Sequence, residues 1–185
     1  KYRPYPKHPD YISDLGGATL NGRALEPLPF DGRLLGRELF ALLRPPIPEF
    51  TVIGGMMVDR DDIFHLLRLT QSWASFKYAL RIIIRHARDR LFWPRGTRLV
   101  MGNALIGRLL LSLLKRGVQI VTDTELQSLV QEGSQIRGVV LRQTRDGQSV
   151  VRTVHARGGV VLASGGFNRH PGLRAQMLPR VPAEW

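Results

Sequence analysis

Hydrophobic residues recur at helical spacing through the middle of the chain and predict three amphipathic helices between residues 59 and 116. Asp59 or Asp61 can cap the first of these helices. The second has one apolar face, made of Trp73, Phe76, Leu80, Ile83 and Ile84. The third carries the widest stripe, made of Met101, Leu105, Leu109 and Leu113 and flanked by Leu110 and Leu114. We therefore expect the third helix to be largely buried and to end at Gly117, which suits a left-handed C-terminal cap.

After the third helix the hydrophobic period changes to two and predicts strands. Val118 and Ile120 form a short strand candidate directly after the helix. Three further strands are expected over residues 124–130, 136–143 and 149–155. The turns between them fall at Glu132-Gly133 and at Asp146-Gly147, and an Asp-Gly pair is a strong hairpin signal. Three strands joined by short turns form an antiparallel meander.

A continuous apolar run follows the meander and predicts a strand buried on both faces. It covers Val160 to Ala163 and stops at Ser164, Gly165 and Gly166. Without a Cβ, a glycine lets the backbone take a positive φ and approach another group closely. In an open α/β sheet a nucleotide cofactor binds at such a strand end, although a double glycine also forms ordinary tight turns. The order of helix, strand, meander and return strand predicts an α/β fold of mixed α+β character.

The first fifty residues are rich in proline and predict extended loop with short regular pieces. Eight of the twelve prolines lie there, namely Pro4, Pro6, Pro9, Pro27, Pro29, Pro45, Pro46 and Pro48. Tyr5 and Tyr11 lie among them, where a phenol either packs with its hydroxyl on water or serves in acid–base chemistry. The chain therefore divides into a proline-rich region 1–58, a helical region 59–116, a strand region 117–168 and an exit segment 169–185.

The charge of the chain raises one alternative class of function. The 185 residues include 27 basic and 15 acidic side chains, and a net charge of +12 raises nucleic acid or an acidic membrane surface as a partner. However, the arginines are scattered, form no consecutive block and do not alternate with aromatic residues. We therefore interpret the charge as a solvated basic surface and expect no nucleic-acid partner, with a basic nucleic-acid-binding module as the alternative.

The composition also bears on metal sites, membrane spans and location. The absence of cysteine excludes disulfides and thiolate metal sites and is compatible with a reducing compartment, so we expect a cytoplasmic protein. His65 and His86 have no partner ligands at metal spacing, so no metal site is expected. No run of 18 apolar residues exists, because Asn103 and Arg108 interrupt the most apolar stretch, and no membrane span is expected.

Three stretches of the sequence resemble one group of flavoproteins. The run from Arg95 to Leu105 (Arg-Gly-Thr-Arg-Leu-Val-Met-Gly-Asn-Ala-Leu), followed by Arg108-Leu109-Leu110, is similar to the FAD-dependent fumarate reductase/succinate dehydrogenase superfamily, and so is the run from Val161 to Phe167. The opening, with Tyr5-Pro6, Pro9-Asp10-Tyr11 and the run from Gly22 to Pro27, most closely resembles the 3-ketosteroid Δ1-dehydrogenase branch. The resemblance spans nearly the whole chain and implies part of an FAD-binding, Rossmann-like domain.

The resemblance implies an oxidoreductase with FAD as cofactor and a steroid-like or other ring ketone as substrate. In this family a tyrosine pair polarises the ketone or removes a neighbouring proton, and a hydride passes to the flavin. Tyr11 is similar to the position of one active-site tyrosine, and Tyr5 is the nearby second candidate. For the cofactor, the resemblance points to the Leu126 backbone near adenine and to a turn past the adenosine and pyrophosphate, made of Ala163, Ser164, Gly165 and Gly166.

The sequence departs from the family pattern at one element. No Gly-x-Gly-x-x-Gly follows a strand with an acidic residue about twenty positions later. We therefore expect the first βαβ unit to lie upstream of Lys1, and the substrate cap and a C-terminal ketone site to lie beyond Trp185. The chain is expected to be a middle fragment that has no activity alone and binds FAD weakly or not at all.

Two alternatives share the flavoprotein fold. A fumarate-reductase-like flavoprotein would need an arginine and carboxylate-binding residues in a cap that this sequence does not contain. A non-catalytic scaffold would lack the glycine fingerprint altogether. Because missing parts would leave apolar surface exposed, we also expect the fragment to form a homo-oligomer.

Overall fold

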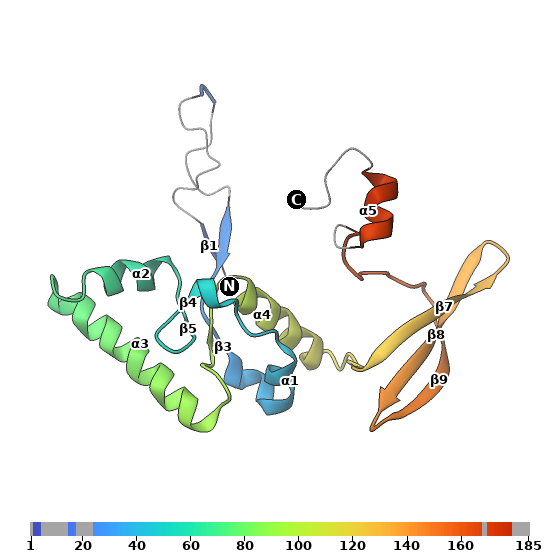
Figure 1. Cartoon of the computed structure of the whole chain (residues 1–185), viewed down its shortest axis with the longest axis horizontal. Coiled ribbons are helices and arrows are strands. Elements are labelled where there is room, and N and C mark those ends of the chain that lie inside the picture. The colour runs from blue at the N-terminus through green and yellow to red at the C-terminus, as the bar shows by residue number, and fades with distance from the viewer. Residues whose placement is uncertain (1, 5–14, 18–23, 168–169, 179–185) are drawn as a thin grey trace. The chain divides into compact units, whose positions relative to one another are not determined.

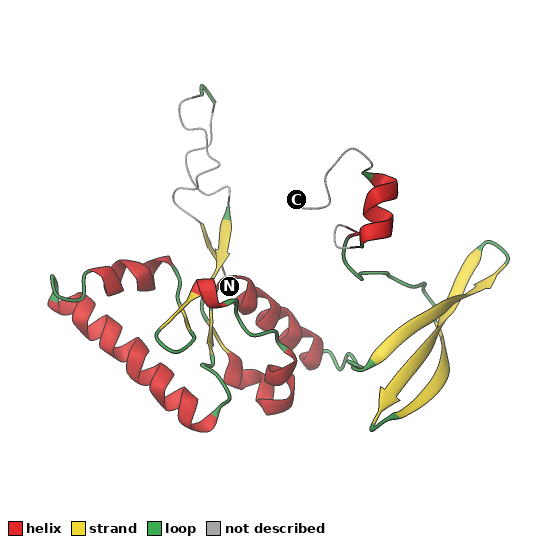
Figure 2. Ribbon diagram, in the orientation of Figure 1, coloured by secondary structure: helices red, strands yellow, loops and turns green. Residues whose placement is uncertain are grey.

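The computed structural model describes residues 2–4, 15–17, 24–167 and 170–178 (Figure 1). It groups the chain into two compact units, Lys1–Gln119 and Ile120–Trp185. Helices and strands are mixed along the chain, as the sequence predicts (Figure 2). The four sheets formed by the described residues are small and antiparallel, so the Rossmann-like sheet stays a prediction, as do the region boundaries drawn from the sequence.

The described residues of the first unit form six short strands and four α-helices. The strands are β1 (Tyr2–Pro4), β2 (Leu25–Pro27), β3 (Phe30–Asp31), β4 (Thr51–Val52), β5 (Met56–Met57) and β6 (Arg98–Leu99). The helices are α1 (Gly36–Leu42), α2 (Arg60–Leu67), α3 (Trp73–Phe92) and α4 (Met101–Lys115), with short 3-10 turns η1 (Gly32–Leu35) and η2 (Pro48–Phe50). The strands pair as β1 with β2, β3 with β6 and β4 with β5.

Local signals in the sequence set two of the helix ends. The Asp59 side chain accepts a hydrogen bond from the backbone N–H of Asp62, and the Asp62 side chain accepts one from the backbone N–H of Asp59. This reciprocal capping box starts α2 at the first of the two predicted aspartates. At the end of α4, Gly117 has φ +67°, and the N–H groups of Gly117 and Val118 donate to the carbonyls of Leu114 and Leu113. The predicted glycine cap is therefore confirmed.

The core of the first unit lies between α1, β3, β6 and α4. Its buried residues are Phe30, Leu35, Phe40, Leu43, Met57, Leu99, Val100 and Ala104. Gly107 lets α4 approach this core closely, because a Cβ added there would lie 2.8 Å from Phe30 Cδ1. A smaller cluster of Met56, Val58 and Ile82 packs between the β4–β5 pair and α3.

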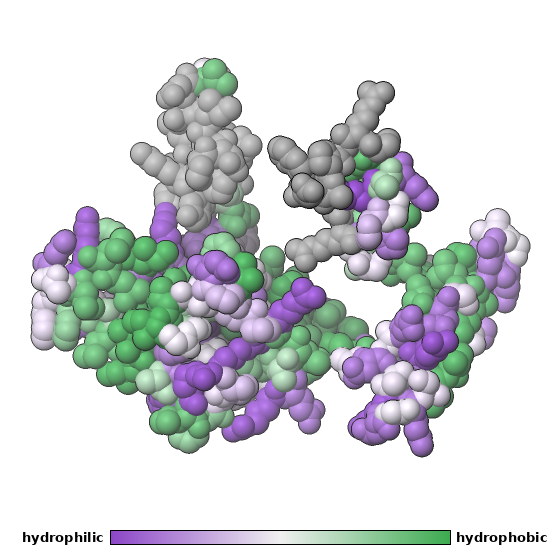
Figure 3. All heavy atoms as spheres, viewed as in Figure 1, coloured by the Kyte–Doolittle hydropathy of each residue, from purple (hydrophilic) through white to green (hydrophobic). Residues whose placement is uncertain are grey.

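The prediction that α4 is largely buried is wrong, and α3 buries only part of its predicted apolar face. On α4, Leu105, Leu109 and Leu113 are exposed, while Ala104 and Gly107 face the core. On α3, Trp73 and Ile84 are exposed, and the buried residues are Ser75, Ala79, Ile82 and Asp89. Both helices approach their neighbours closely through small residues, and larger side chains such as Leu110, Leu114 and Ile82 pack beside these points of contact. Figure 3 shows hydrophobic side chains gathered over α2 and α3.

The second unit contains the predicted meander. Strands β7 (Thr124–Glu132), β8 (Gln135–Arg145) and β9 (Gln148–His155) form an antiparallel sheet in that order. The β8–β9 turn has positive φ at both Asp146 (+51°) and Gly147 (+79°), as a tight hairpin turn of this type requires. A short helix, α5 (Pro171–Met177), follows.

Two predicted strands are absent from the described residues. Residues 118–121 and 158–166 have no strand pairing, and Val161 is 89% exposed. A strand buried on both faces requires paired neighbours and covering side chains, and no described element supplies them. Among the described residues, no helix combines the length and the apolar character needed to cross a bilayer.

Candidate functional site

The main chain at the predicted cofactor turn is open and irregular, and residues 161–166 form no turn. Gly165 has φ +92°, which confirms the predicted positive φ there. Residues 161–166 are all exposed, and a Cβ added to Gly165 or to Gly166 would meet no heavy atom within 4 Å. Bare backbone that another group can approach is what a dinucleotide phosphate requires, so these residues fit the cofactor that the resemblance implies.

The Leu126 backbone lies in β7, an edge strand of the meander. Leu126 faces Leu141 of β8, and the register shifts between Leu126 and Ser128, which leaves Gln127 without a directly opposite residue. An edge strand presents backbone N–H and C=O groups that its sheet does not pair. This position is therefore compatible with a hydrogen bond to an adenine ring, and that role stays a prediction.

Both candidate catalytic residues, Tyr5 and Tyr11, lie outside the described residues. The segment that contains them continues from Pro4 of β1 and returns at Leu25 of β2. Pro4 and Leu25 face each other in the β1–β2 ladder. The structure therefore defines where this segment leaves and re-enters the first unit, and the roles of the two tyrosines stay predictions.

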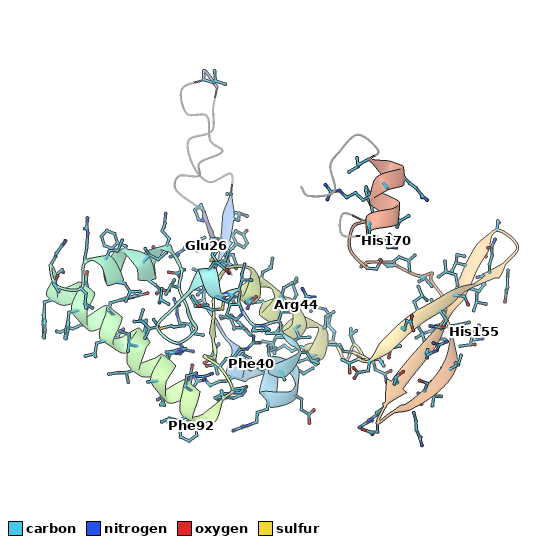
Figure 4. The ribbon with its side chains drawn as sticks, viewed as in Figure 1. Glu26, Phe40, Arg44, Phe92, His155 and His170 are labelled. Carbon is cyan, nitrogen blue, oxygen red and sulfur yellow. The ribbon has the colours of Figure 1, made fainter. Side chains whose placement is uncertain are left out.

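A pocket of about 360 Å³ opens beside the start of α4 and was not indicated by the sequence. Its wall is largely apolar, with carboxylates from Glu26 and Asp59, and its apolar lining includes Phe50, Val52, Val58, Ile63 and Met101. Met101 has φ +51°, a backbone conformation that non-glycine residues seldom adopt. A second pocket shares Glu26 and Met101 with the first. Figure 4 labels Glu26 at this place, near the base of the β1–β2 pair.

A buried carboxylate, Asp62, is the centre of a charged network around this pocket. Asp62 is 0% exposed and accepts hydrogen bonds from the backbone N–H of Asp59 (2.8 Å) and the hydroxyl of Tyr78 (2.7 Å). The Arg98 guanidinium donates to both oxygens of Asp62, at 2.7 and 3.1 Å. Buried charges are tolerated when they are paired and hydrogen-bonded in this way.

Arg3 joins the β1–β2 pair to the same network. Its Nε donates to Glu26 Oε2 at 3.0 Å, and its Nη1 donates to Asp61 on α2. Its Nη2 lies 3.6 Å from Asp59 Oδ2, and Arg98 Nη2 lies 3.4 Å from the same oxygen. Asp59 therefore lies between two guanidinium groups that come from opposite ends of the first unit's sequence.

The protonation of this network follows from burial and from its excess of carboxylates. Burial raises the pKa of Asp59, the Asp62 carboxylate raises it further, and Arg98 and Arg3 oppose this rise without cancelling it. Burial and the hydrogen bond donated to Asp62 also raise the pKa of Tyr78. Burial alone would lower the pKa of Arg3, but its hydrogen bonds to Glu26 and Asp61 outweigh burial and raise it.

The two histidines considered as metal ligands have other partners. His65 Nδ1 lies 3.1 Å from Ser75 Oγ, and its ring stacks on Tyr78 at 4.3 Å between centroids. His86 Nε2 lies 3.4 Å from the carbonyl of Gly54. Within the described part of the chain, no group of three or more histidine or acidic side chains is arranged to hold a metal ion.

Of this network, the sequence pattern indicated Asp59 and Asp61, as alternative helix caps. The Asp-x-x-Asp spacing of residues 59 and 62 resembles a capping box and was a signal for Asp62 as well. No local pattern indicates Arg98, which reaches Asp62 across 36 positions. Arg3 and Glu26 are likewise 23 positions apart, with the tyrosine-containing segment between them.

Comparison with known proteins relates this chain to enzymes about three times its length. A sequence profile described as an FAD binding domain matches residues 7–185. The chain is 33% identical over 184 residues to a 3-oxosteroid 1-dehydrogenase of Mycolicibacterium smegmatis. It is 34% identical over 180 residues to a 4-oxocyclohex-2-ene-1-carboxylate 5-dehydrogenase of Sinomonas cyclohexanicum. Each alignment covers 97% of this chain but only 31% and 30% of the respective relative.

A solved structure supports the same relationship. The crystal structure of a 3-ketosteroid delta1-dehydrogenase from Sterolibacterium denitrificans, in complex with 1,4-androstadiene-3,17-dione, matches with a TM-score of 0.78 and 32% identity. The match covers 100% of this chain and 33% of that one. The resemblance predicted from three stretches of the sequence is thereby confirmed.

Proposed function

Because the chain belongs to the FAD-binding domain family, we propose that it forms part of an FAD-dependent dehydrogenase that acts on a 3-ketosteroid or a similar ring ketone. One observation carries the proposal: the two relatives described above, each aligned with 97% of the chain, are named as dehydrogenases of a ring ketone. The similar crystal structure also holds a steroid ketone. Since the chain spans about a third of these proteins, the proposed activity is that of a longer polypeptide.

The second unit would hold the cofactor. The open stretch at residues 161–166 supports contacts from Ala163, Ser164, Gly165 and Gly166, because its main chain is exposed and no side chain fills the space beside its glycines. Ser164 adds a hydroxyl donor, and the β7 edge offers backbone groups at Leu126 for adenine. FAD, when bound, supplies the acceptor for a hydride. A Rossmann-like element outside this sequence would supply the phosphate-binding glycines.

The first unit would act on the substrate. Tyr11, with Tyr5 as the second candidate, would polarise the ring ketone or take the proton beside it. The supporting observation is the Pro9-Asp10-Tyr11 motif in a region that aligns with ketone dehydrogenases. A phenol with an ordinary pKa near 10 serves as a base at neutral pH only when its surroundings lower that value.

The chain alone would have no turnover. Its candidate tyrosines and proposed cofactor contacts would form only part of a complete active site and FAD site, because the chain spans about a third of its relatives. The exposed apolar residues of α3 and α4, which include Trp73, Ile84 and Leu109, would favour self-association of the isolated chain. A cytoplasmic location remains part of the proposal.

An assay of the complete dehydrogenase with ring ketones and an artificial electron acceptor tests this function. We expect oxidation of a 3-ketosteroid or a cyclohexanone carboxylate, and a decrease in kcat of about 10²- to 10⁴-fold for Tyr11→Phe. The isolated chain should show no turnover and no stoichiometric yellow complex with FAD. A complete protein that retains FAD but oxidises no ketone of either class would exclude the proposed activity.

A further inference from the structure

The outer face of α3 is a stripe of large apolar side chains. They recur at spacings of three, four and seven residues, which places them on one side of the helix, and they are Trp73, Phe76, Leu80, Ile84 and Leu91. Their exposed fractions lie between 37% and 78%. The opposite side of α3 packs on the first unit and contains the buried residues Ser75, Ala79, Ile82 and Asp89. Most of the large apolar side chains of α3 therefore lie on its exposed side.

The end of α2 and its connection to α3 extend this apolar surface. The exposed apolar residues there are Ile63, Phe64, Leu67 and Leu69, with exposed fractions of 36–76%. Helices α2 and α3 contact each other, and Figure 3 shows their hydrophobic side chains gathered together. At the start of α3, the rings of Trp73 and Phe76 stack with centroids 5.2 Å apart. An exposed apolar surface of this extent marks an interaction site, whereas single exposed apolar residues do not.

The charges beside this surface are all of one sign. The exposed charged side chains of residues 63–92 are basic, namely Arg68, Lys77, Arg81, Arg88 and Arg90. The acidic residue of this range, Asp89, is 3% exposed and accepts hydrogen bonds from the backbone N–H and the hydroxyl of Thr97. Lys77, Arg81 and Arg88 are four and seven residues apart, so they form a row along one side of the outer face. An anionic partner therefore matches the charge of this surface.

We propose that the outer face of α3, together with the exposed apolar residues of α2, docks onto a membrane that contains anionic lipids. A helix with Trp, Phe and Leu on one face and Lys and Arg beside them lies in the plane of a bilayer, with its apolar face among the acyl chains. The long stems of Lys77, Arg81 and Arg88 allow their charges to stay at the lipid headgroups. This docking does not depend on the proposed function.

The stripe and the row of charges together favour a lipid surface over other anionic partners. A nucleic acid would pair with the basic row but would leave the aliphatic side chains of Leu80, Ile84 and Leu91 in water. A second copy of this chain could cover the stripe, but it would bring a second basic row close to the first, and like charges repel. An anionic bilayer satisfies both features at once.

The first measurement is co-sedimentation of the complete protein with lipid vesicles, which needs neither substrate nor turnover. Phosphatidylcholine vesicles are compared with a three-to-one mixture of phosphatidylcholine and phosphatidylserine. We expect binding to the mixed vesicles at low salt, and binding about tenfold or more weaker to phosphatidylcholine alone, because each basic residue near an anionic surface adds to the affinity. Added salt should weaken the binding to the mixed vesicles.

Two double variants separate the apolar and the charged contributions. Trp73→Gln with Ile84→Gln should weaken binding to the mixed vesicles about tenfold or more, because both side chains lose their burial among acyl chains. Arg81→Gln with Arg88→Gln should weaken it by about tenfold or more through the lost charges. The matched controls are Leu109→Gln on α4, where the leucine is 53% exposed, and Arg152→Gln on β9, and both should bind like the wild type.

The second measurement is quenching of tryptophan fluorescence by mixed vesicles whose acyl chains are brominated. The wild-type complete protein should be quenched, because Trp73 would lie among the acyl chains. Trp73→Phe keeps an aromatic ring and should still bind, but it should lose most of the quenching. This comparison requires no destabilising substitution, since Trp73 is 69% exposed.

Several results would overturn the proposal. One is a complete protein that binds no mixed vesicles at low salt, which would mean that another part of the polypeptide covers the outer face. Another is a lipid-free dimer that the Trp73→Gln and Ile84→Gln variant dissociates, which would assign the face to a second copy. Equal binding to both kinds of vesicle would exclude the anionic partner. Wild-type binding by both double variants, or equal quenching with and without Trp73, would place the contact elsewhere.

Discussion

Arg98 and Asp62 form a two-pronged ion pair in which each carboxylate oxygen receives its own N–H group, at 2.7 and 3.1 Å. The pair joins β6 to α2, and Asp62 is completely buried. Because Tyr78 and the backbone of Asp59 donate to the same carboxylate, four donors converge on Asp62. This arrangement is the basis of the first two predictions.

Asp62→Ala should destabilise the first unit by about 3–5 kcal/mol, because it leaves the Arg98 charge buried without its main partner. The measurement is denaturant unfolding followed by tryptophan fluorescence. Glu125→Gln, on the exposed edge of the meander, is the control and should change stability by less than about 1 kcal/mol. Equal effects of the two substitutions would contradict the assigned importance of Asp62.

Tyr78→Phe should cost about 1.5 kcal/mol, because it removes one hydrogen bond to a charged group while keeping the ring. Since burial and the bond to Asp62 raise the pKa of Tyr78, this phenol should ionise above the ordinary phenol pKa of 10.0. An alkaline absorbance titration should therefore lose its highest-pH tyrosine step in Tyr78→Phe. Retention of that step would show that another tyrosine produces it.

Asp59→Asn should change the pH dependence of stability in a defined direction. Because the pKa of Asp59 is raised in the folded state above the ordinary 3.8, its contribution to stability is greatest at low pH and is lost as pH rises through the raised value. The free energy of unfolding of the wild type, relative to Asp59→Asn, should therefore fall as pH rises above about 3.8. Asparagine keeps the helix cap, so the comparison isolates the charge.

Asp31→Asn should show the opposite pH dependence of stability. Burial alone would raise the pKa of Asp31, but hydrogen bonds from Arg33 and the charge of Arg85 outweigh it and lower the pKa. The wild type should therefore gain stability over Asp31→Asn as pH rises through the lowered folded pKa up to about 3.8. The same sign for both variants would contradict these assignments.

Gly107→Ala and Gly102→Ala test how α4 packs. At Gly107 a methyl group would lie 2.8 Å from Phe30 Cδ1, so overpacking of about 1–3 kcal/mol should exceed the helix-propensity gain of about 1 kcal/mol. At Gly102 no heavy atom lies within 4 Å, and the same substitution should stabilise by up to about 1 kcal/mol. Thermal unfolding of both variants measures the difference, and stabilisation by Gly107→Ala would contradict the packing described.

Gly165→Ala tests the cofactor turn. A side chain at φ +92° is strained and would also occupy the space where FAD is proposed to approach the main chain. The complete dehydrogenase should therefore lose FAD more readily, as measured by flavin absorbance after gel filtration. Gly158→Ala has the same open surroundings without the positive φ and should retain FAD. Equal retention by both variants would count against the assignment.

The candidate site was predictable only where its signals are local. The proposed cofactor contact at Ser164–Gly166 was recognisable because its two glycines directly follow an apolar run in the sequence, and Gly165 has the expected positive φ. The ion pair of Arg3 and Glu26 was not recognisable, because each could have paired with many other charged residues of the chain, and the two are 23 positions apart. The pocket beside Met101 also needed the fold, since its wall comes from segments far apart in the sequence.

The sequence by itself determined the elements whose ends depend on neighbours a few positions away. These are the capping box of α2, the glycine cap of α4 and the Asp146-Gly147 hairpin, all of which are set by hydrogen bonds or backbone torsions within one turn. Tertiary structure alone decided which side of each helix is buried. On α4 the closest approach to Phe30 and Leu99 is made by Ala104 and Gly107, because only small residues fit there. Leu110 and Leu114 pack beside this contact, whereas Leu105, Leu109 and Leu113 are exposed. Likewise the apolar run at 160–163 forms no strand in the described structure, because hydrophobicity favours burial but only a paired neighbour can provide it.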